Sequence, residues 1–121
     1  MSRQKKLLHV AITAHQKGRL TEAEKTYLEI LNDLPKDSQI LYLLSIINFQ
    51  KAEFIKAERF VLQAIEVDPT VVDYYSNLGR IFRVQGKLLQ ATNAYKQALK
   101  IDDQDAQIHS DLAAVLIEGG R

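Results

Sequence analysis

Arg80 and Arg83 are the side chains in this sequence best suited to hold an anion. They lie three residues apart, so on a helix they point to the same side. A guanidinium group can donate two parallel hydrogen bonds to a carboxylate or a phosphate. Solvated surface charge, or pairing with Asp111, explains the two arginines equally well. The spacing therefore indicates a candidate anion site and leaves these alternatives open.

Metal binding and catalysis find little support among the other polar residues. The three histidines do not share a helix face at the spacing of metal ligands. Asp102, Asp103 and Asp105 lack the central glycine and distal glutamate of a calcium loop, so helix capping explains them better. The chain has no cysteine, no glycine-rich phosphate loop and no nucleophile elbow. We therefore expect no metal, no cofactor and no enzymatic activity.

Tyr42, Ile46 and Phe49 form an apolar stripe at the spacing i, i+4, i+7. On a helix these side chains share one face, and it differs from the face that Leu44 and Ser45 need for packing. Such a stripe could anchor an amphipathic helix or an extended peptide. Additional packing within the fold explains it equally well, and both interpretations stay open here.

Composition limits the class of partner. With 121 residues, 46% hydrophobic and 26% charged, the chain is sized for one domain with a hydrophobic core. The formal net charge of +1 gives no reason to expect nucleic acid or an anionic membrane as a partner. Residues 1–14 only faintly resemble a signal peptide, and no stretch approaches the roughly 20 apolar residues of a membrane span. We therefore expect a cytoplasmic protein without membrane insertion.

A period of 34 residues is the strongest signal in the chain. The turn position recurs as Gly18, Ala52, Gly86 and Gly120, and a small residue recurs as Ala11, Ser45, Gly79 and Ala113. Within each period, apolar residues at i, i+3, i+4 and i+7 predict two antiparallel helices joined by a tight turn. The prediction is one domain, 1–121, with repeats at 4–37, 38–71 and 72–105. Residues 106–118 would form the first helix of an incomplete fourth repeat, or a capping helix.

The third repeat carries a family resemblance. Its pattern Tyr75-x2-Leu78-Gly79-x2-Phe82, followed by Ala91-x3-Tyr95 and Ala98, resembles the tetratricopeptide repeat signature. The resemblance implies an all-α, right-handed superhelical solenoid of antiparallel helix hairpins with a concave groove lined mainly by first helices. Ile30 departs from the alanine of the later repeats, which predicts a wider gap between the first and second hairpins. Residues 15–20 and 75–79 also resemble repeats that precede glycosyltransferase and sulfotransferase domains.

The resemblance implies a non-enzymatic scaffold that binds a peptide or protein segment in this groove. Tetratricopeptide domains that bind acidic chaperone tails use a lysine and an asparagine at the places of Leu8 and Ile12, so that ligand is not expected. The alternative is the N-terminal module of a larger glycosyltransferase- or sulfotransferase-type enzyme, which would position a protein substrate. The predicted groove residues are His9, Ile12, Gln39, Tyr42, Ile46, Phe49, Asp73, Asn77, Arg80 and Arg83.

The two ends of the sequence differ in charge. Basic residues meet no acidic one before Glu22, whereas acidic residues gather after residue 101. Solvated surfaces explain this pattern; a head-to-tail contact between copies, or with a further part of the chain, is the alternative. The helix Ala106 to Glu118 is apolar over a wide arc, although a terminal capping helix ordinarily has a polar outer face. We expect it to be covered by further repeats or by self-association.

Overall fold

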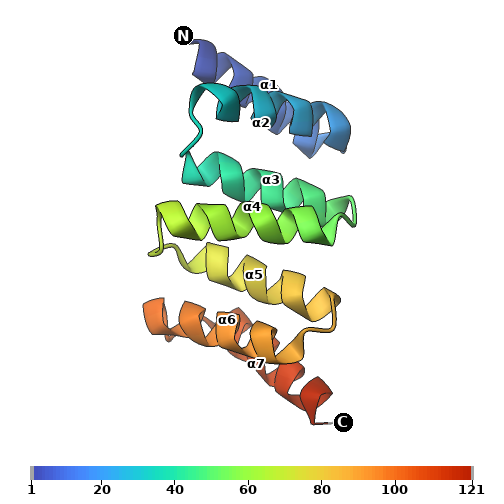
Figure 1. The fold of residues 1–121 in the computed structure, drawn as a ribbon, viewed down its shortest axis with the longest axis vertical. Helices are drawn as coiled ribbons and strands as arrows, with labels where there is room; N and C mark the ends of the chain where they lie inside the picture. Colours follow the sequence, from blue (N-terminus) through green and yellow to red (C-terminus); the bar gives the residue numbers. More distant parts are fainter. Residues whose placement is uncertain (1, 121) are drawn as a thin grey trace. The chain divides into compact units, whose positions relative to one another are not determined.

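The computed structural model describes residues 2–120, which form α-helices and no strand. The seven helices of this part are α1 (Arg3–Gln16), α2 (Leu20–Asp33), α3 (Ser38–Gln50), α4 (Phe54–Val67), α5 (Val72–Val84), α6 (Leu88–Ile101) and α7 (Ala106–Gly119). Successive helices run in opposite directions within each hairpin (Figure 1). The predicted all-α hairpin fold is confirmed.

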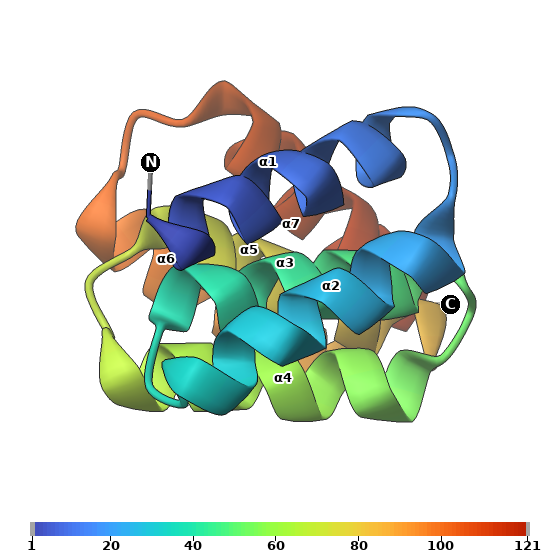
Figure 2. The ribbon, with the colours of Figure 1, turned by 90° about the horizontal axis from the view of Figure 1, so that it is seen from above.

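The three hairpin turns share one backbone conformation at the positions that the 34-residue period predicts. Gly18 and Gly86 both have φ of 77°, and Ala52 has φ of 60°. Glycine adopts this left-handed conformation without strain because it has no β-carbon, whereas alanine does so at a cost. Within the first four helices the connections alternate between the two helix ends, as Figure 2 shows for α1–α2 and α2–α3.

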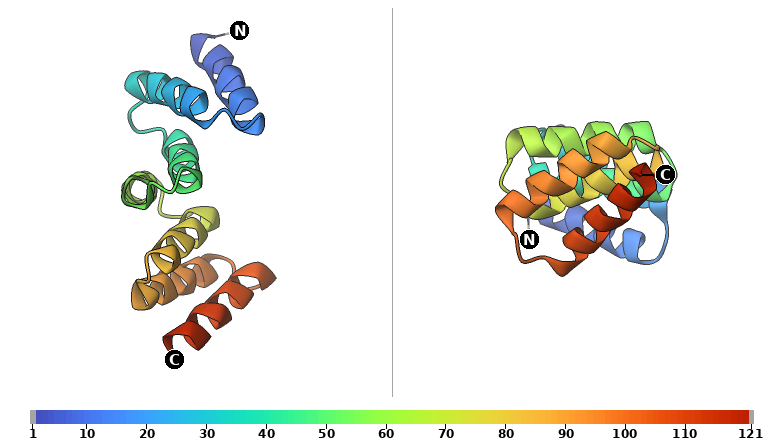
Figure 3. Two further views of the ribbon diagram at one scale, coloured as in Figure 1. Left: turned by 90° about the vertical axis from the view of Figure 1, so that its right-hand side faces the viewer. Right: turned by 90° about the horizontal axis from the view of Figure 1, so that it is seen from below.

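The chain divides into two compact units, one ending at Val67 and one beginning at Asp68. In the first unit, α2 packs against α1 and α3, and α3 packs against α4. Its core includes Tyr27, Ile30, Leu44 and Ile47, all almost completely buried. Figure 3 (left) shows α1 and α3 in one layer of this unit and α2 and α4 in the other. The finer division into repeats stays a prediction.

In the second unit, α6 packs against both α5 and α7. The α5–α6 contact is closest where Gly79 meets the ring of Tyr95, since a β-carbon at position 79 would lie 2.7 Å from Tyr95 Cζ. A residue without a side chain is therefore required for these two helices to approach as they do.

Aspartates cap two of the helices. The backbone N–H of Ile40 donates to Asp37 Oδ1 over 3.1 Å at the start of α3. At the start of α7, the N–H groups of Gln107 and Ile108 donate to Asp105 Oδ1 over 3.0 and 3.1 Å. These bonds satisfy amide groups that have no partner inside the helix. The capping role predicted for the acidic cluster around residue 105 is therefore confirmed for Asp105.

Candidate functional site

Six of the predicted groove residues lie on α1 and α3 of the first unit. We call this surface the α1–α3 face; it comprises His9, Ile12, Gln39, Tyr42, Ile46 and Phe49. A hydrogen bond of 2.8 Å between His15 Nε2 and Gln50 Oε1 joins the last turns of the two helices. The two helices that carry the predicted residues are therefore neighbours, and their relative position is held by a side-chain contact.

The apolar stripe on α3 divides into two parts. The Phe49 ring packs edge-on against Phe54 of α4, with ring centroids 5.5 Å apart. Phe49 therefore contributes to hairpin packing, the alternative that the sequence left open. Tyr42 and Ile46 are half-buried, and Ile12 on α1 is exposed. These three side chains present apolar surface from two adjacent helices.

The other four predicted residues lie on α5 of the second unit and differ in exposure. Asp73 and Arg80 are exposed, whereas Asn77 is 3% exposed. Arg83 is half-buried and donates from Nε to Glu118 Oε1 of α7 over 2.9 Å. The two arginines therefore play different roles. Arg83 links α5 to α7 through its ion pair with Glu118, and Arg80 presents its charge to solvent.

The partner of Arg83 corrects one of the alternatives drawn from the sequence. The described ion pair of Arg83 is with Glu118, not with Asp111. Hydrogen bonding to Glu118 raises the pKa of Arg83, so this guanidinium remains charged. Burial raises the pKa of the nearby Tyr95 phenol, and the charges of Asp111, Arg80, Arg83 and Glu118 also act on it. Charges of both signs on α5 and α7 therefore act on the Tyr95 hydroxyl.

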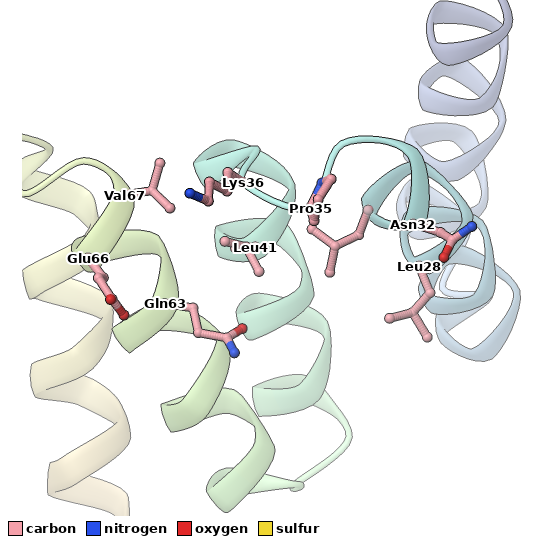
Figure 4. Close-up of a pocket in the computed structure, with 9 residues that line it drawn as sticks. Leu28, Asn32, Pro35, Lys36, Leu41, Gln63, Glu66 and Val67 are labelled. Carbon is pink, nitrogen blue, oxygen red and sulfur yellow. The ribbon is translucent and has the colours of Figure 1, made fainter.

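A cleft of about 820 Å³ opens between α2 and α4 of the first unit (Figure 4). We call it the α2–α4 cleft; its lining residues are Leu28, Leu31, Asn32, Pro35, Lys36, Leu41, Gln63, Glu66 and Val67. Leu28 and Val67 are each 43% exposed in it. The cleft lies between the first and second hairpins, where Ile30 predicts a wider gap. Ile30 of α2 is almost completely buried, at the position where the later repeats have Ala64 and Ala98.

The part of the chain that the structure describes contains neither a cluster of metal ligands nor a membrane-spanning helix. Between residues 2 and 120, no three His, Cys, Asp or Glu side chains converge as metal ligands would. His15 and His109 instead form hydrogen bonds with Gln50 and with the Asp103 carbonyl oxygen, both over 2.8 Å. None of the helices in this range is long and apolar enough to cross a membrane.

Comparison with known proteins identifies the family. A family model described as TPR repeat matches residues 79–120. The UDP-N-acetylglucosamine–peptide N-acetylglucosaminyltransferase of Caenorhabditis elegans is 34% identical over 87 residues, which are 72% of this chain and 8% of that enzyme. The chain is a tetratricopeptide repeat protein. The anaphase-promoting complex subunit CDC16 of Saccharomyces cerevisiae is 26% identical over 106 residues, 82% of this tetratricopeptide chain and 13% of that subunit.

Solved structures agree with this assignment. The first TPR of Spaghetti (RPAP3), bound to the HSP90 peptide SRMEEVD, aligns with a TM-score of 0.93 and 17% identity. The alignment covers 98% of this tetratricopeptide chain and 94% of that domain. It shows a shared fold. In contrast, this chain spans only about a tenth of the length of its relatives in worm and yeast (8% and 13%).

Two contacts that shape the site were not predicted from the sequence of the tetratricopeptide repeats. Phe54, which packs against Phe49, and Glu118, which pairs with Arg83, were not assigned these contacts. The acidic character of the last helix was a signal for the second pair, because Glu118 is 35 residues after Arg83, about one period. No comparable signal distinguishes Phe54 from other apolar residues at helix starts.

Proposed function

We propose that this tetratricopeptide repeat protein is a non-catalytic interaction module that binds a peptide segment on the α1–α3 face. The observation that carries the proposal is the apolar surface of Ile12, Tyr42 and Ile46, presented by two adjacent helices. An apolar anchor surrounded by polar residues is the usual source of affinity in peptide recognition. The peptide-bound structure of the RPAP3 domain supports the choice of ligand class for this fold.

The expected ligand is anchored by apolar side chains rather than by an acidic tail. Leu8 and Ile12 occupy first-helix places where polar clamp residues would be needed to hold a terminal carboxylate. On the second unit, Arg80 presents an exposed guanidinium, while Glu118 already pairs with Arg83. We therefore propose Ile12, Tyr42 and Ile46 as the anchors of this ligand.

A random peptide library displayed on phage tests the proposal. Peptides selected on the wild-type chain should contain bulky apolar residues and should lose at least about tenfold in affinity for the Tyr42→Ala and Ile46→Ala variants, as anchor truncations typically do. The matched control is Ile55→Ala on α4, which is 72% exposed and lies outside the α1–α3 face. The acidic peptide SRMEEVD should bind weakly. Peptides that bind the Ile46→Ala variant as tightly as wild type would place the site elsewhere.

The second candidate function is that of a module within a larger glycosyltransferase, positioning its protein substrate. It is favoured by the 34% identity to the Caenorhabditis elegans transferase over 72% of this chain. The coding sequence beyond Arg121 distinguishes the two candidates. A catalytic domain encoded there would favour the transferase module, and further repeats or a stop codon would favour the independent scaffold.

A further inference from the structure

The outward side of α7 is an apolar face that no other helix of the second unit covers. Leu116 and Ile117 are 54% and 58% exposed, and Ala113 beside them is also exposed. We call these three residues the α7 face. At the position equivalent to Ala113, Ser45 is completely buried and its hydroxyl donates to the Ala57 carbonyl oxygen of α4 over 2.8 Å. The α7 face is therefore built like a surface that receives a second helix.

A complementary exposed position occurs on α1. Val10 is 46% exposed, whereas Leu44, one period later, is completely buried in the core shared with α2. Val10 belongs to a stripe at the spacing i, i+4, i+7, i+11 that we call the α1 stripe: Lys6, Val10, Thr13 and Lys17. The mean direction of this stripe is about 100° around the helix from that of His9 and Ile12. The stripe adjoins the α1–α3 face at His9, which lines one shallow hollow together with Val10 and Thr13.

The α1 stripe and the α7 face lie near charges of opposite sign, which favours α1 of a second copy as the helix that packs on the α7 face. The segment 2–21 carries five basic residues and no acidic one, and the segment 102–120 carries five acidic residues and no basic one. Asp102 and Asp103 are exposed immediately before α7, and Lys6 and Lys17 are exposed at opposite ends of the α1 stripe. Two α7 faces would bring like charges together, whereas α1 and α7 attract each other.

We propose that copies of this chain associate head to tail, with the α1 stripe of one copy packed antiparallel on the α7 face of the next. With Val10 over Ala113, Lys17 lies opposite Ala106, because both are seven residues, or about 10 Å, from the contact. Lys17 then approaches the carboxylates that precede α7. Lys6 approaches the C-terminal end of α7, where the helix dipole favours a positive charge.

This arrangement predicts weak, reversible and open-ended association. Each helix has 14 residues, and one such crossing buries less than the roughly 1,200 Å² of a stable complex. Because the α1 stripe and the α7 face differ, every added copy presents a new free surface, unless the rotation between successive copies closes a ring. Association should therefore increase with protein concentration and decrease as salt screens the opposite charges.

Sedimentation velocity of the 121-residue chain tests association directly. The average mass should rise between about 10 µM and about 1 mM, the range in which weak contacts become populated. Raising sodium chloride from about 0.05 M to about 1 M should reduce it, because the Debye length falls to about 3 Å. Lys17→Glu and Asp103→Lys should each weaken association at least about tenfold, and a mixture of the two variants should recover part of it. Lys56→Glu, an exposed change on α4, is the matched control.

Mixing two blocked variants tests the head-to-tail geometry. Val10→Asp blocks the α1 stripe and Leu116→Asp blocks the α7 face, so each variant alone should be monomeric. Their mixture should form one-to-one dimers, because each supplies the surface that the other lacks. Leu89→Asp, at a 75% exposed position on α6, controls for adding a charge at an exposed leucine.

Three outcomes would overturn the proposal. The first is a monomer at every concentration, the second is a Val10→Asp variant that still dimerises, and the third is association that Leu116→Asp leaves unchanged. Circular dichroism of each variant verifies that it is folded. Failure of peptide binding by Ile46→Ala leaves this test unaffected, because Ile46 lies on neither surface.

Discussion

Gly79 of α5 lies directly against the ring of Tyr95 of α6, at a separation that leaves no room for a β-carbon. Gly79→Leu should therefore lower the free energy of unfolding by about 3 kcal/mol through overpacking. Urea unfolding followed by circular dichroism measures the change. In the second hairpin, Ser45 and Val61 occupy the equivalent positions. The double variant Gly79→Ser/Tyr95→Val, which copies this pair, should consequently be much more stable than Gly79→Leu. An unchanged unfolding midpoint for Gly79→Leu would contradict the helix contact described above.

Ala52 is strained because its φ of 60° belongs to the left-handed region. Ala52→Gly should raise the stability of the first unit by about 1 kcal/mol, since glycine adopts this conformation freely. Gly18 and Gly86 provide matched controls. A β-carbon at either position would meet no atom within 4 Å. Gly18→Ala and Gly86→Ala should therefore cost about 1 kcal/mol from backbone strain alone. Thermal unfolding of all three variants measures the differences, and equal midpoints would exclude a role for backbone strain.

Asn48 is completely buried, and its amide group is only partly satisfied. Its Nδ2 donates to the Leu44 carbonyl oxygen over 2.8 Å, but Oδ1 has no hydrogen-bond partner among the described residues. The equivalent positions carry the apolar Ala14 and Phe82. Asn48→Leu should raise the free energy of unfolding by about 1 kcal/mol, because an unpaired buried carbonyl is removed. Denaturant titration measures the gain; a loss of more than about 1 kcal/mol would show that packing at this site outweighs the polar penalty.

Ile30 is predicted to hold the α2–α4 cleft open. Ile30→Ala should allow α2 to settle closer to α3 and narrow the cleft, with a stability cost of about 2 kcal/mol, near the low end for such truncations. The chain has no cysteine, so spin labels can be placed at Asn32→Cys and Gln63→Cys on opposite walls of the cleft. Electron–electron distance measurements should show a shorter separation in the Ile30→Ala background. An unchanged separation would mean that other residues set the width of the cleft.

The hairpins could be predicted because their determinants are local. Turn residues such as Gly18 and Ala52, and apolar spacing within about 15 residues, specify two helices and the bend between them. Repetition of that pattern every 34 residues then identified the architecture, since such a period is typical of stacked helical hairpins. The caps at Asp37 and Asp105 follow from the same local chemistry.

Roles within the candidate site depended on contacts between helices that are distant in sequence. Phe49 and Tyr42 share one stripe, but only Phe49 meets an aromatic ring from the following helix. Arg80 and Arg83 are the same residue type on the same helix, yet Glu118 of α7 pairs with Arg83.

The sequence by itself determined the helices, their turns and their 34-residue repetition, because these follow from backbone conformation and from the spacing of apolar side chains along a helix. Tertiary structure alone decided that Asn77 is buried, that Arg80 is exposed and that the α7 face is uncovered. These properties depend on which helix packs over each side chain. The spacing of apolar residues within one helix does not encode which other helix will cover it, because that contact depends on how the side chains of both helices pack together.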